Sequence, residues 1–332
     1  MSIRIGIAGF GKIGKIRHDI LAKRKDCQIV GIFEKNIDHQ SNSSYNYFKS
    51  IDELLNNVDA VVISTFNDSL AEFTKKAINK NIHVFCEKPP ARTVDELKGV
   101  QNALNKKKQI VLKYGFNHRY HHSVIEAKSK IDKGTYGKLL FSRGIYGKAG
   151  SIDYRDNWRN YKKISGGGIL LDQGIHMLDL MLYLSGSEMK LLKSQMSNLH
   201  WDIECEDNVF AMFTNEQNSI FTLHSSATHW SHKFLLELFY ENGYIILDGI
   251  LSQTMSYAPE KLITAKKSEN TNIAMGKLNE KTLIFDNDIS WESELNEFLE
   301  CIKNKKTPIN GNIKDAMQVL NLVEEIYKRN EQ

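Results

Sequence analysis

Apolar residues in the first third of the chain form short continuous runs, separated by longer segments in which they recur every three or four positions. The short runs are rich in isoleucine and valine and predict strands at residues 3–8, 29–34, 60–64, 82–86 and 109–114. The segments between them predict helices, and the helix after Thr93 opens with a capping-box pattern, Thr93 with Glu96. Strands that alternate with helices form right-handed crossovers, so this part predicts a doubly wound parallel sheet to about residue 118.

The remainder of the chain has a different pattern. Helical spacing covers residues 121–132, 168–184, 291–302 and 313–327, whereas residues 209–214, 220–225, 234–240 and 244–247 read as strands. Short turns at 215–218 and 241–243 predict hairpins between these strands. We therefore predict an α/β protein with a doubly wound domain over residues 1–118. Residues 119–332 are expected to form an α+β domain on an open, mostly antiparallel sheet.

Composition and charge narrow the class of protein. Of the 332 residues, 41% are hydrophobic and 25% are charged, as in an ordinary globular enzyme. The 44 basic and 40 acidic residues give a net charge of +4, too balanced to indicate a nucleic-acid or membrane partner. The most apolar later stretch, 166–186, contains Asp172, His176 and Asp179, so no membrane-spanning segment is predicted.

Cysteine and histidine spacing gives little sign of a metal site. The chain has four cysteines that lie far apart and form no CxxC pair, Cys27, Cys86, Cys205 and Cys301. They predict neither a disulfide framework nor structural zinc, and a reduced, cytoplasmic setting is expected. His118, His121 and His122 lie close in sequence, but no Cys or carboxylate follows at metal-ligand spacing, so we expect no metal.

The first chemical motif is a glycine-rich turn that directly follows the predicted strand at 3–8 and opens a helix. It has the GxGxxG spacing of dinucleotide-binding turns and reads Gly9-Phe10-Gly11-Lys12-Ile13-Gly14. Gly9 allows a tight turn, Gly11 lets the backbone approach a pyrophosphate, and Gly14 lets the helix pack on the strand. We expect this turn to bind the cofactor phosphates at the positive end of the helix.

An acidic residue, Glu34, ends the second predicted strand twenty residues beyond Gly14. A carboxylate at this place can accept hydrogen bonds from the adenosine ribose hydroxyls. The 2′-phosphate of NADP would face a like charge, which at about 4 Å costs on the order of 4 kcal/mol at an effective dielectric constant near 20. We therefore expect NAD rather than NADP, with the neighbouring Lys35 able to soften this discrimination.

Two further motifs carry charged groups suited to catalysis. Glu87-Lys88-Pro89 follows the predicted strand at 82–86, on the edge where open α/β sheets bind ligands, so Lys88 can hold a substrate oxygen. Asp172 and His176 are four residues apart in a predicted helix and share one face. The carboxylate can orient the imidazole as a base, although such a pair in an apolar helix is more often structural.

In order and spacing these motifs resemble the Gfo/Idh/MocA oxidoreductases, the glucose–fructose oxidoreductase, inositol dehydrogenase and rhizopine-catabolism family. The resemblance covers nearly the whole chain: the glycine turn, Thr65 to Asn67, Glu87-Lys88-Pro89, and Gly166-Gly167-Gly168 through Asp172 to His176. It implies an N-terminal Rossmann domain and a catalytic set of Lys88, Asp172 and His176. It also implies a homodimer or homotetramer formed through the exposed face of the C-terminal sheet.

The resemblance also implies further cofactor contacts. They come from Thr65, Phe66, Asn67, Glu87, Lys88 and Asn117, the last in a segment that crosses near the nicotinamide. The chain departs from the family at one loop. The family usually has Thr-Pro-Asn followed three residues later by His, whereas this chain has Thr65-Phe66-Asn67 and then Leu70.

A polar segment at 153–159, just before the glycine-rich helix, is a candidate lid over the substrate. Candidate substrate contacts are Tyr146 and, within the segment, Arg155, Asn157, Trp158 and Arg159. The cations suit a carboxylate or phosphate on the substrate. A solvated basic loop explains the same residues equally well.

The expected reaction is reversible oxidation of a secondary alcohol on a sugar-like substrate, such as a sugar, inositol, sugar acid or nucleotide-sugar. His176 takes the hydroxyl proton while the hydride passes to nicotinamide, Lys88 polarises the reacting oxygen, and Asp172 orients His176. Two other functions stay open: an NAD-retaining glycosidase or lyase that acts by transient oxidation, and a non-catalytic sugar-sensing regulator. The intact set of three side chains argues against the regulator.

Overall fold

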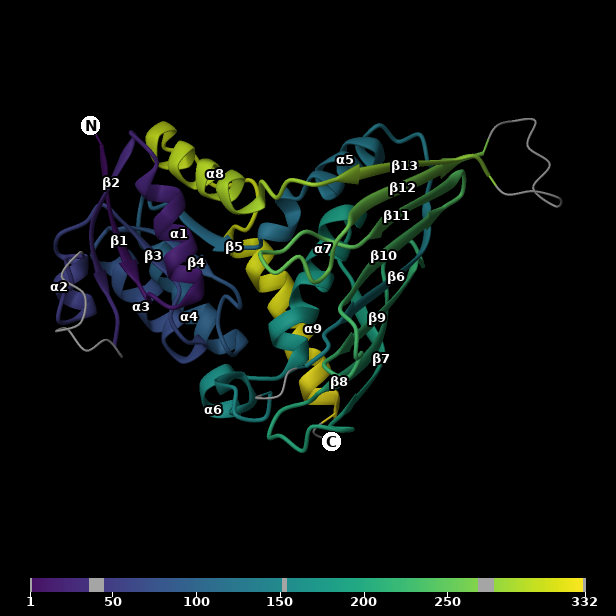
Figure 1. The fold of residues 1–332 in the computed structure, drawn as a ribbon, viewed down its shortest axis with the longest axis horizontal. Helices are drawn as coiled ribbons and strands as arrows, with labels where there is room; N and C mark the ends of the chain where they lie inside the picture. Colours follow the sequence, from purple (N-terminus) through teal and green to yellow (C-terminus); the bar gives the residue numbers. More distant parts are fainter. Residues whose placement is uncertain (1, 36–44, 151–153, 268–277, 331–332) are drawn as a thin grey trace. The chain divides into compact units, whose positions relative to one another are not determined.

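The computed structural model describes residues 2–35, 45–150, 154–267 and 278–330 (Figure 1). The chain groups into two compact units, each with its own sheet. The first contains Met1–Phe116, Lys163–Gly166 and Trp291–Leu320, and the second contains Asn117–Lys162, Gly167–Ser290 and Asn321–Gln332. The first unit therefore includes a C-terminal segment as well as the N-terminal part of the chain, and a domain boundary at residue 118 stays a prediction.

A five-stranded parallel sheet forms the centre of the first unit, in the order β2-β1-β3-β4-β5. Its strands are β1 (Ile3–Ala8), β2 (Cys27–Phe33), β3 (Ala60–Ile63), β4 (His83–Glu87) and β5 (Leu112–Gly115). All five overlap the predicted strands, so the predicted parallel sheet is confirmed. The strand order reverses at β1, which lies between β2 and β3, and open α/β sheets bind ligands outside the carboxyl ends of the strands at such a point.

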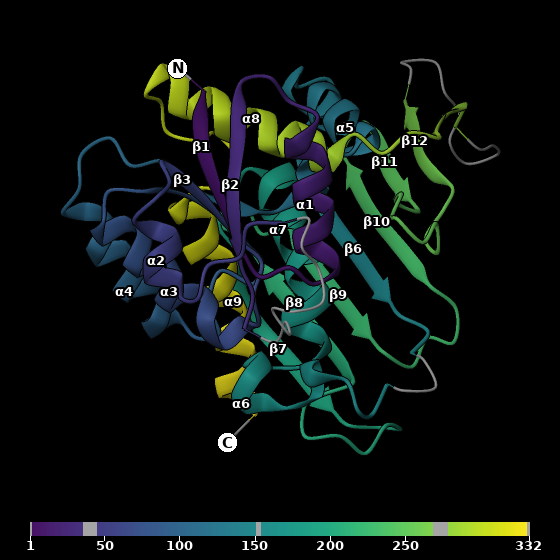
Figure 2. The same ribbon diagram turned by 60° about the vertical axis from the view of Figure 1, so that its left-hand side comes forward.

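Helices cover both faces of this sheet (Figure 2). They are α1 (Lys12–Ala22), α2 (Ile51–Leu55), α3 (Asn67–Asn79), α4 (Val94–Asn105) and α8 (Ser290–Asn304). On one face, Leu21 of α1 and Phe298 of α8 join a buried cluster with Ile5 and Phe85 of the sheet. On the other, Leu54 of α2 packs directly over Gly6 of β1. The doubly wound arrangement is therefore confirmed.

The predicted cap of α4 is present in part. The Thr93 hydroxyl accepts a hydrogen bond from the N–H of Glu96 at 3.2 Å. The Glu96 carboxylate, however, accepts from the N–H of Arg92 at 3.0 Å, one residue before the reciprocal partner of a capping box. The guanidinium of Arg92 bonds to the same carboxylate, and this ion pair explains the shift.

An eight-stranded sheet forms the centre of the second unit, in the order β13-β12-β11-β10-β6-β9-β8-β7. Its strands are β6 (Leu139–Gly147), β7 (Lys190–Ser197), β8 (Asn208–Thr214), β9 (Ile220–Ser226), β10 (Lys233–Tyr240), β11 (Gly243–Asp248), β12 (Glu260–Lys266) and β13 (Glu280–Phe285). Neighbouring strands are antiparallel except β6 and β9, which are parallel. The predicted open, mostly antiparallel sheet is confirmed, and β8 to β11 overlap the predicted strands.

One face of the second sheet packs against helices. These are α5 (His122–Asp132), which contacts β11 to β13, and α7 (Ile175–Ser185), which contacts β6 and β9. The 3-10 helix η1 (Asn117–Tyr120) precedes α5, and a π-helical turn η3 (Leu170–Gly174) precedes α7. The helix predicted over 168–184 is therefore a π turn followed by an α-helix.

Three further elements complete the fold. They are the 3-10 helix η2 (Trp158–Asn160), the short helix α6 (Lys162–Ser165) and the C-terminal helix α9 (Ile313–Asn330). No helix among the described residues is both long and apolar enough to cross a membrane.

Candidate active site

The glycine turn lies between β1 and α1 in the first unit. Gly9 has a φ of 90°, and a side chain there would begin 2.5 Å from the carbonyl oxygen of Ser64. A side chain at Gly14 would collide with the carbonyl oxygen of Gly9. Gly11, by contrast, has an ordinary φ of −70°, and no atom of the described residues lies within 4 Å of its side-chain position. The fold itself thus requires glycine at positions 9 and 14, whereas Gly11 leaves its backbone open to a ligand.

The first turn of α1 presents backbone donors beside this open position. Gly11 precedes the first helical residue and caps the helix without a side-chain hydrogen bond, and the first turn holds no acidic residue. Phe10 is buried, Ile13 is half-buried and Lys12 is exposed. The N-terminus of a helix favours anions, so the turn has both the donors and the space that a pyrophosphate needs.

The Glu34 carboxylate lies against the same turn. Its Oε2 accepts a hydrogen bond from the N–H of Phe10 at 2.6 Å. Lys35 beside it is exposed. A carboxylate has more acceptor positions than one N–H uses, so Glu34 can still accept bonds from ribose hydroxyls.

The loop after β3 reaches the same edge of the sheet as the glycine turn. Phe66 precedes α3 and is 41% exposed. The amide of Asn67 donates to the carbonyl oxygen of Ser165 at 2.8 Å, and Thr65 accepts a hydrogen bond from Ser69 at 3.3 Å. Leu70, at the position where the family usually has His, is fully buried, so the departure from the family pattern places an apolar side chain in the core.

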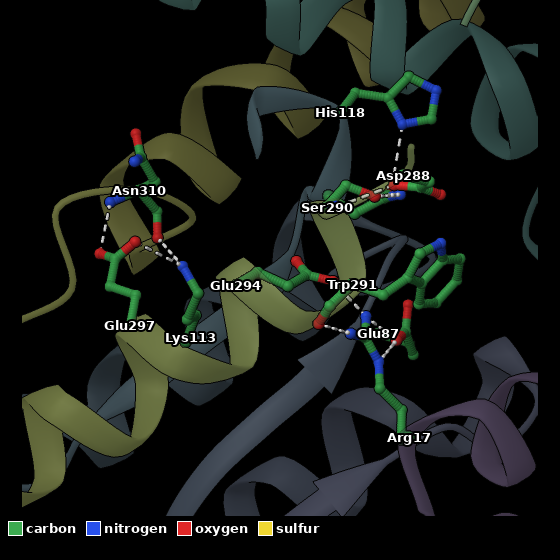
Figure 3. A network of polar contacts seen from close by, with 11 residues as sticks. Arg17, Glu87, Lys113, His118, Asp288, Ser290, Trp291, Glu294, Glu297 and Asn310 are labelled. Atoms are coloured by element: carbon green, nitrogen blue, oxygen red, sulfur yellow. Dashed lines mark hydrogen bonds and ion pairs between the residues drawn. The ribbon is translucent and has the colours of Figure 1, made fainter. Parts of the chain in front are cut away.

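Glu87 ends β4 and lies in a buried ion network directly before Lys88 (Figure 3). Its Oε1 accepts hydrogen bonds from Nε and Nη2 of Arg17 at 2.8 and 2.6 Å. Arg17 belongs to α1, is fully buried, and also bonds to Glu294 of α8. Its guanidinium lies 4.5 Å from the ring centre of Trp291, and the network thus ties α1, β4 and α8 together.

Sequence reasoning did not find Arg17. A signal was present, since this arginine interrupts the apolar stripe of Ile13, Ile16 and Ile20 on α1. A cation on the buried face of a helix needs a carboxylate partner. The sequence holds no information on which carboxylate that is, because Glu87 and Glu294 come from distant segments.

Glu294 shares Arg17 with Glu87. Burial raises the pKa of Glu294 to about 7, and the charge of Glu87 adds to the increase, although Arg17 and Lys113 oppose it. Its second oxygen, Oε2, is buried with no hydrogen-bond partner among the described residues. Near neutral pH, Glu294 is therefore partly protonated, while Arg17 bonds to both Glu87 and Glu294.

In the second unit, Asp172 lies in the π-helical turn η3 and faces two cations. Its Oδ1 accepts a hydrogen bond from Nε of Arg159 at 3.2 Å, and Nζ of Lys148 lies 3.8 Å from its Oδ2. The amide of Gln173 also donates to Oδ2, at 3.3 Å. Lys148 was not among the predicted site residues, because nothing in its sequence surroundings distinguishes it from other lysines.

His176 lies in the first turn of α7, four residues after Asp172, and only 4% of it is exposed. Its ring stacks on that of His118, with the centroids 3.9 Å apart and the planes 14° apart. Nε2 of His118 lies 3.0 Å from the hydroxyl of Tyr146, and Nδ1 lies 3.0 Å from Oδ1 of Asn117. The second unit therefore brings together four residues that the sequence singles out, Asn117, His118, Tyr146 and His176.

The charge of Asp172 acts on three tyrosines of the second unit. Burial, reinforced by the charge of Asp172, raises the pKa of Tyr146, Tyr154 and Tyr257. For Tyr146 the charge state of Tyr257 also contributes. The three phenols therefore keep their hydrogens across the physiological pH range.

The candidate lid residues have mixed roles. Arg159 reaches Asp172 and lies over the ring of Trp158, 4.5 Å from its centre. Asn157 accepts a hydrogen bond from the N–H of Arg159 at 3.1 Å and so caps η2, while Arg155 is exposed. Residue 153, the first of the segment, lies outside the described residues.

The histidine cluster is divided among different partners. Nδ1 of His121 lies 2.8 Å from the Glu260 carboxylate, and the ring of His122 stacks on Phe285 with centroids 5.5 Å apart. Within the described ranges, no group of three or more His, Cys, Asp or Glu side chains has the arrangement of a metal site.

The fold and these residues define a dinucleotide-binding protein of the doubly wound type, with a second unit on a mixed sheet. Two family profiles match the chain. Residues 3–116 match the oxidoreductase family with an NAD-binding Rossmann fold, and residues 124–246 match the GFO/IDH/MocA C-terminal domain. The chain belongs to the Gfo/Idh/MocA oxidoreductase family, as its motifs predict.

Individual relatives have related names. The chain is 29% identical over 195 residues to glucose-6-phosphate 3-dehydrogenase of Bacillus subtilis, covering 56% of this chain and 54% of the relative. It is 37% identical over 147 residues to levoglucosan dehydrogenase of Pseudarthrobacter phenanthrenivorans, covering 44% of this chain and 37% of the relative. The matches thus span about half, or less, of the length of these curated relatives. A solved structure of levoglucosan dehydrogenase in complex with NADH has the same fold, with a TM-score of 0.84, 22% identity, and coverage of 99% of this chain and 98% of that chain.

Proposed function

We propose that this protein is an NAD-dependent oxidoreductase that transfers a hydride between a secondary alcohol of a sugar-like substrate and nicotinamide. One observation carries the proposal: at the reversal of strand order, the glycine turn leaves open space beside Gly11 and holds the Glu34 carboxylate against it. The names of the relatives, dehydrogenases of glucose 6-phosphate and levoglucosan, support the class of substrate.

When bound, the cofactor supplies the hydride acceptor, and the chain supplies binding and orientation. The turn from Gly9 to Gly14 and the first N–H groups of α1 bind the pyrophosphate, and Glu34 accepts bonds from the ribose hydroxyls. The loop at 65–67 and the segments holding Glu87 and Asn117 complete the proposed cofactor contacts. Glu87 acts there through its bond to Arg17, which fixes the end of β4.

The proposed chemistry uses three side chains. Lys88, at the carboxyl end of β4, holds and polarises the reacting oxygen. His176 accepts the proton of the substrate hydroxyl, and Asp172 orients His176 and favours its protonated form. Arg159 and Lys148 lie beside Asp172 and therefore next to the proposed site of reaction. We propose that these two cations bind an anionic substituent of the substrate.

The cofactor part of the proposal is tested by one pair of glycine substitutions. Gly11→Ala places a methyl group in the open space without strain, so folding is expected to be unchanged while NAD binding weakens at least tenfold. Gly99→Ala in α4 is the matched control, because its side-chain position is also open, and it is expected to leave NAD affinity unchanged. Calorimetric titration with NAD measures both variants. Wild-type affinity in Gly11→Ala contradicts the proposed binding mode.

The substrate class is tested by a screen that follows NADH absorbance. Sugars, inositols, sugar acids and nucleotide-sugars are each mixed with NAD and the purified protein. Reduction of NAD by at least one member supports the proposal. Cleavage of a glycoside without net NADH formation supports the NAD-retaining hydrolase or lyase instead, and binding without any turnover supports a sensor.

We also propose a cytoplasmic homo-oligomer, a homodimer or homotetramer formed through the second sheet. The four cysteines are free and buried, which is compatible with a reducing compartment. The sheet face away from α5 and α7 carries exposed apolar side chains on neighbouring strands, Phe141, Phe210, Met212 and Ile220. Apolar patches of this kind mark interaction surfaces. We propose the domain division at residue 118, with cofactor binding in the N-terminal domain and substrate binding and oligomerisation in the C-terminal domain.

A further inference from the structure

We infer that His118 is a positioning residue for His176. Its ring stays neutral in one fixed tautomer, and the face of this ring stabilises His176 when His176 carries a proton. The inference rests on the proposed role of His176 as the base. It adds a residue that would act through His176, without a proton transfer of its own.

The geometry of the two rings is the first support. They lie face to face with centroids 3.9 Å apart and planes 14° apart. Both residues are buried, His118 with 7% of its surface exposed and His176 with 4%. A contact this close fixes the plane of the His176 ring, and thereby the directions in which its nitrogens point.

Hydrogen bonds fix the tautomer of His118. The amide nitrogen of Asn117 donates to the hydroxyl of Ser290 at 3.1 Å, so the amide oxygen of Asn117 faces His118. An amide oxygen only accepts, and Nδ1 of His118 therefore carries the hydrogen. Nε2 is then the acceptor for the hydroxyl of Tyr146, 3.0 Å away.

This arrangement opposes protonation of His118. A proton on Nε2 would end the hydrogen bond that this nitrogen accepts from Tyr146. The hydroxyl of Tyr146 keeps its hydrogen because burial raises the pKa of Tyr146, and it would have to turn that hydrogen away. A neutral aromatic ring attracts a cation placed over its face, whereas two protonated rings in contact would repel each other. A proton taken from substrate is therefore stabilised on His176.

Other charged groups around the pair are compensated by neighbours. Arg119 pairs with Asp179 at 2.6 Å, and His121, whose ring is 5.6 Å from that of His118, lies 2.8 Å from Glu260. Other titratable groups nearby are Asp288, 4.0 Å from Nδ1 of His121, Asp172 with its cations Arg159 and Lys148, and Tyr257, whose ring contacts those of Tyr146 and His232. The bonds at both nitrogens of His118 favour its neutral form, so a proton on the stacked pair is held by His176.

Nitrogen-15 NMR of the histidine-labelled, substrate-free protein tests the inference without any turnover. We expect wild-type His118 to give the signals of a neutral Nδ1–H tautomer from pH 5.5 to 8. Of the two stacked rings, only His176 is expected to take up a proton in this range. Tyr146→Phe removes the donor to Nε2, so His118 is expected to titrate in this range and the pKa of His176 to fall. Assignment uses the spectra of His118→Gln and His176→Gln.

A second pair of variants tests the stacked face. His118→Leu removes the aromatic face and is expected to lower the pKa of His176 by about half a unit to one unit. His118→Phe keeps an aromatic face that cannot take a proton, and a shift of less than about 0.3 units is expected. A wild-type His118 that titrates or carries its hydrogen on Nε2 overturns the inference, as does an unchanged pKa of His176 in His118→Leu.

Failure of this inference and failure of the proposed function give different results. Once a substrate is identified, normal turnover by His176→Ala contradicts the proposed base and with it the catalytic purpose of the stack. If His176→Ala is inactive but the pH profile of kcat is the same in His118→Leu and the wild type, His176 is still supported as the base, and the proposed role of His118 is contradicted. A profile that shifts toward lower pH in His118→Leu, together with the NMR result, supports both.

Discussion

We propose that the Glu34 carboxylate has two roles, one in the glycine turn and one at the cofactor. One oxygen accepts the N–H of Phe10 and so supports the conformation of the glycine turn. The remaining acceptor capacity faces the place where the cofactor ribose is proposed to bind. Because the first task needs only an acceptor and the second also depends on charge, substitutions can separate them.

We predict that the wild-type protein binds NAD at least tenfold more tightly than NADP. Glu34→Gln keeps an acceptor for the N–H of Phe10 and removes the charge, so the preference should narrow while thermal stability changes little. Glu34→Ala should narrow the preference as well and also lower stability. Lys35→Gln is the control, expected to leave or strengthen the preference for NAD. Titration with both cofactors measures the ratio, and equal wild-type affinities contradict the assignment.

The sequence predicts the positions of site residues that lie next to a recognisable strand or motif. It does not predict the roles of residues that depend on partners from distant segments. The glycine turn and Lys88 stand next to strands that the sequence reveals, so their positions follow from local pattern. His118 shows no such signal, because its role depends on Asn117, Tyr146 and His176, which the fold brings together from three elements. Glu87 is expected at the cofactor, and its carboxylate also bonds to Arg17, a partner from a distant segment that no local pattern identifies.

At the scale of elements, Arg17 connects α1, β4 and α8 through buried charges. The segment just after β4 contains Lys88, and α1 begins at the glycine turn. The network therefore holds together two of the proposed functional segments of the first unit.

We predict that Arg17→Met destabilises the protein by about 3–5 kcal/mol, because it leaves two buried carboxylates without their cation. Arg4→Met is the control. Arg4 also pairs with a carboxylate, Asp59, but at the exposed surface, so a much smaller loss of stability is expected there. Urea unfolding at pH 7.5 measures both variants. Similar losses for the two variants would argue against a buried, cooperative network.

The same network predicts a pH dependence of stability. The pKa of Glu294 is raised to about 7 in the folded protein from an ordinary value of 4.5, so folding takes up a proton. The stability from this group is fully present below about pH 4.5 and is lost as the pH rises through about 7. Between pH 5 and 8 the loss is on the order of 2–3 kcal/mol.

Unfolding free energies at pH 5 and pH 8 check this prediction. Glu294→Gln should remove the loss of stability between pH 5 and 8. The free energy of unfolding of the variant should therefore rise relative to that of the wild type as the pH rises. Glu292→Gln changes an exposed carboxylate on the same helix and should follow the wild type at both pH values. An identical pH dependence in Glu294→Gln and the wild type would sink the prediction.

Strands of the second sheet show where sequence patterns fail. β8 to β11 were predicted because their apolar residues alternate or cluster, as in β10, where every second residue is buried. β7 and β13 were missed because half of the residues of β7 and five of the six residues of β13 are exposed, so neither strand shows an alternating apolar face. β6 includes Arg143 and two glycines, whose low strand preference hides it. Its central place in the sheet depends on pairing with β10 and β9.

At the scale of the whole molecule, the exposed apolar face of the second sheet predicts self-association. Phe210 and Met212 alternate with buried residues on β8, and they are 51% and 43% exposed. We predict that the wild type is a dimer or tetramer and that Phe210→Glu with Met212→Lys dissociates it. Ile309→Glu, at an 82% exposed position of the first unit, is the control and should not change the mass. Light scattering after gel filtration measures the mass, and a monomeric wild type contradicts this prediction.

We propose that His176 accepts the substrate proton and that Lys88 polarises the reacting oxygen during hydride transfer. Single-turnover and steady-state kinetics of His176→Ala on a substrate from the screen test this proposal. We expect kcat to fall by roughly 10² to 10⁴ while NAD affinity stays within a few fold. Lys88→Ala should also lose kcat, and the double variant should lose less than the product of the two single effects. Near-normal turnover by His176→Ala would contradict the proposal, and the Asp172 and His176 pair would then be structural.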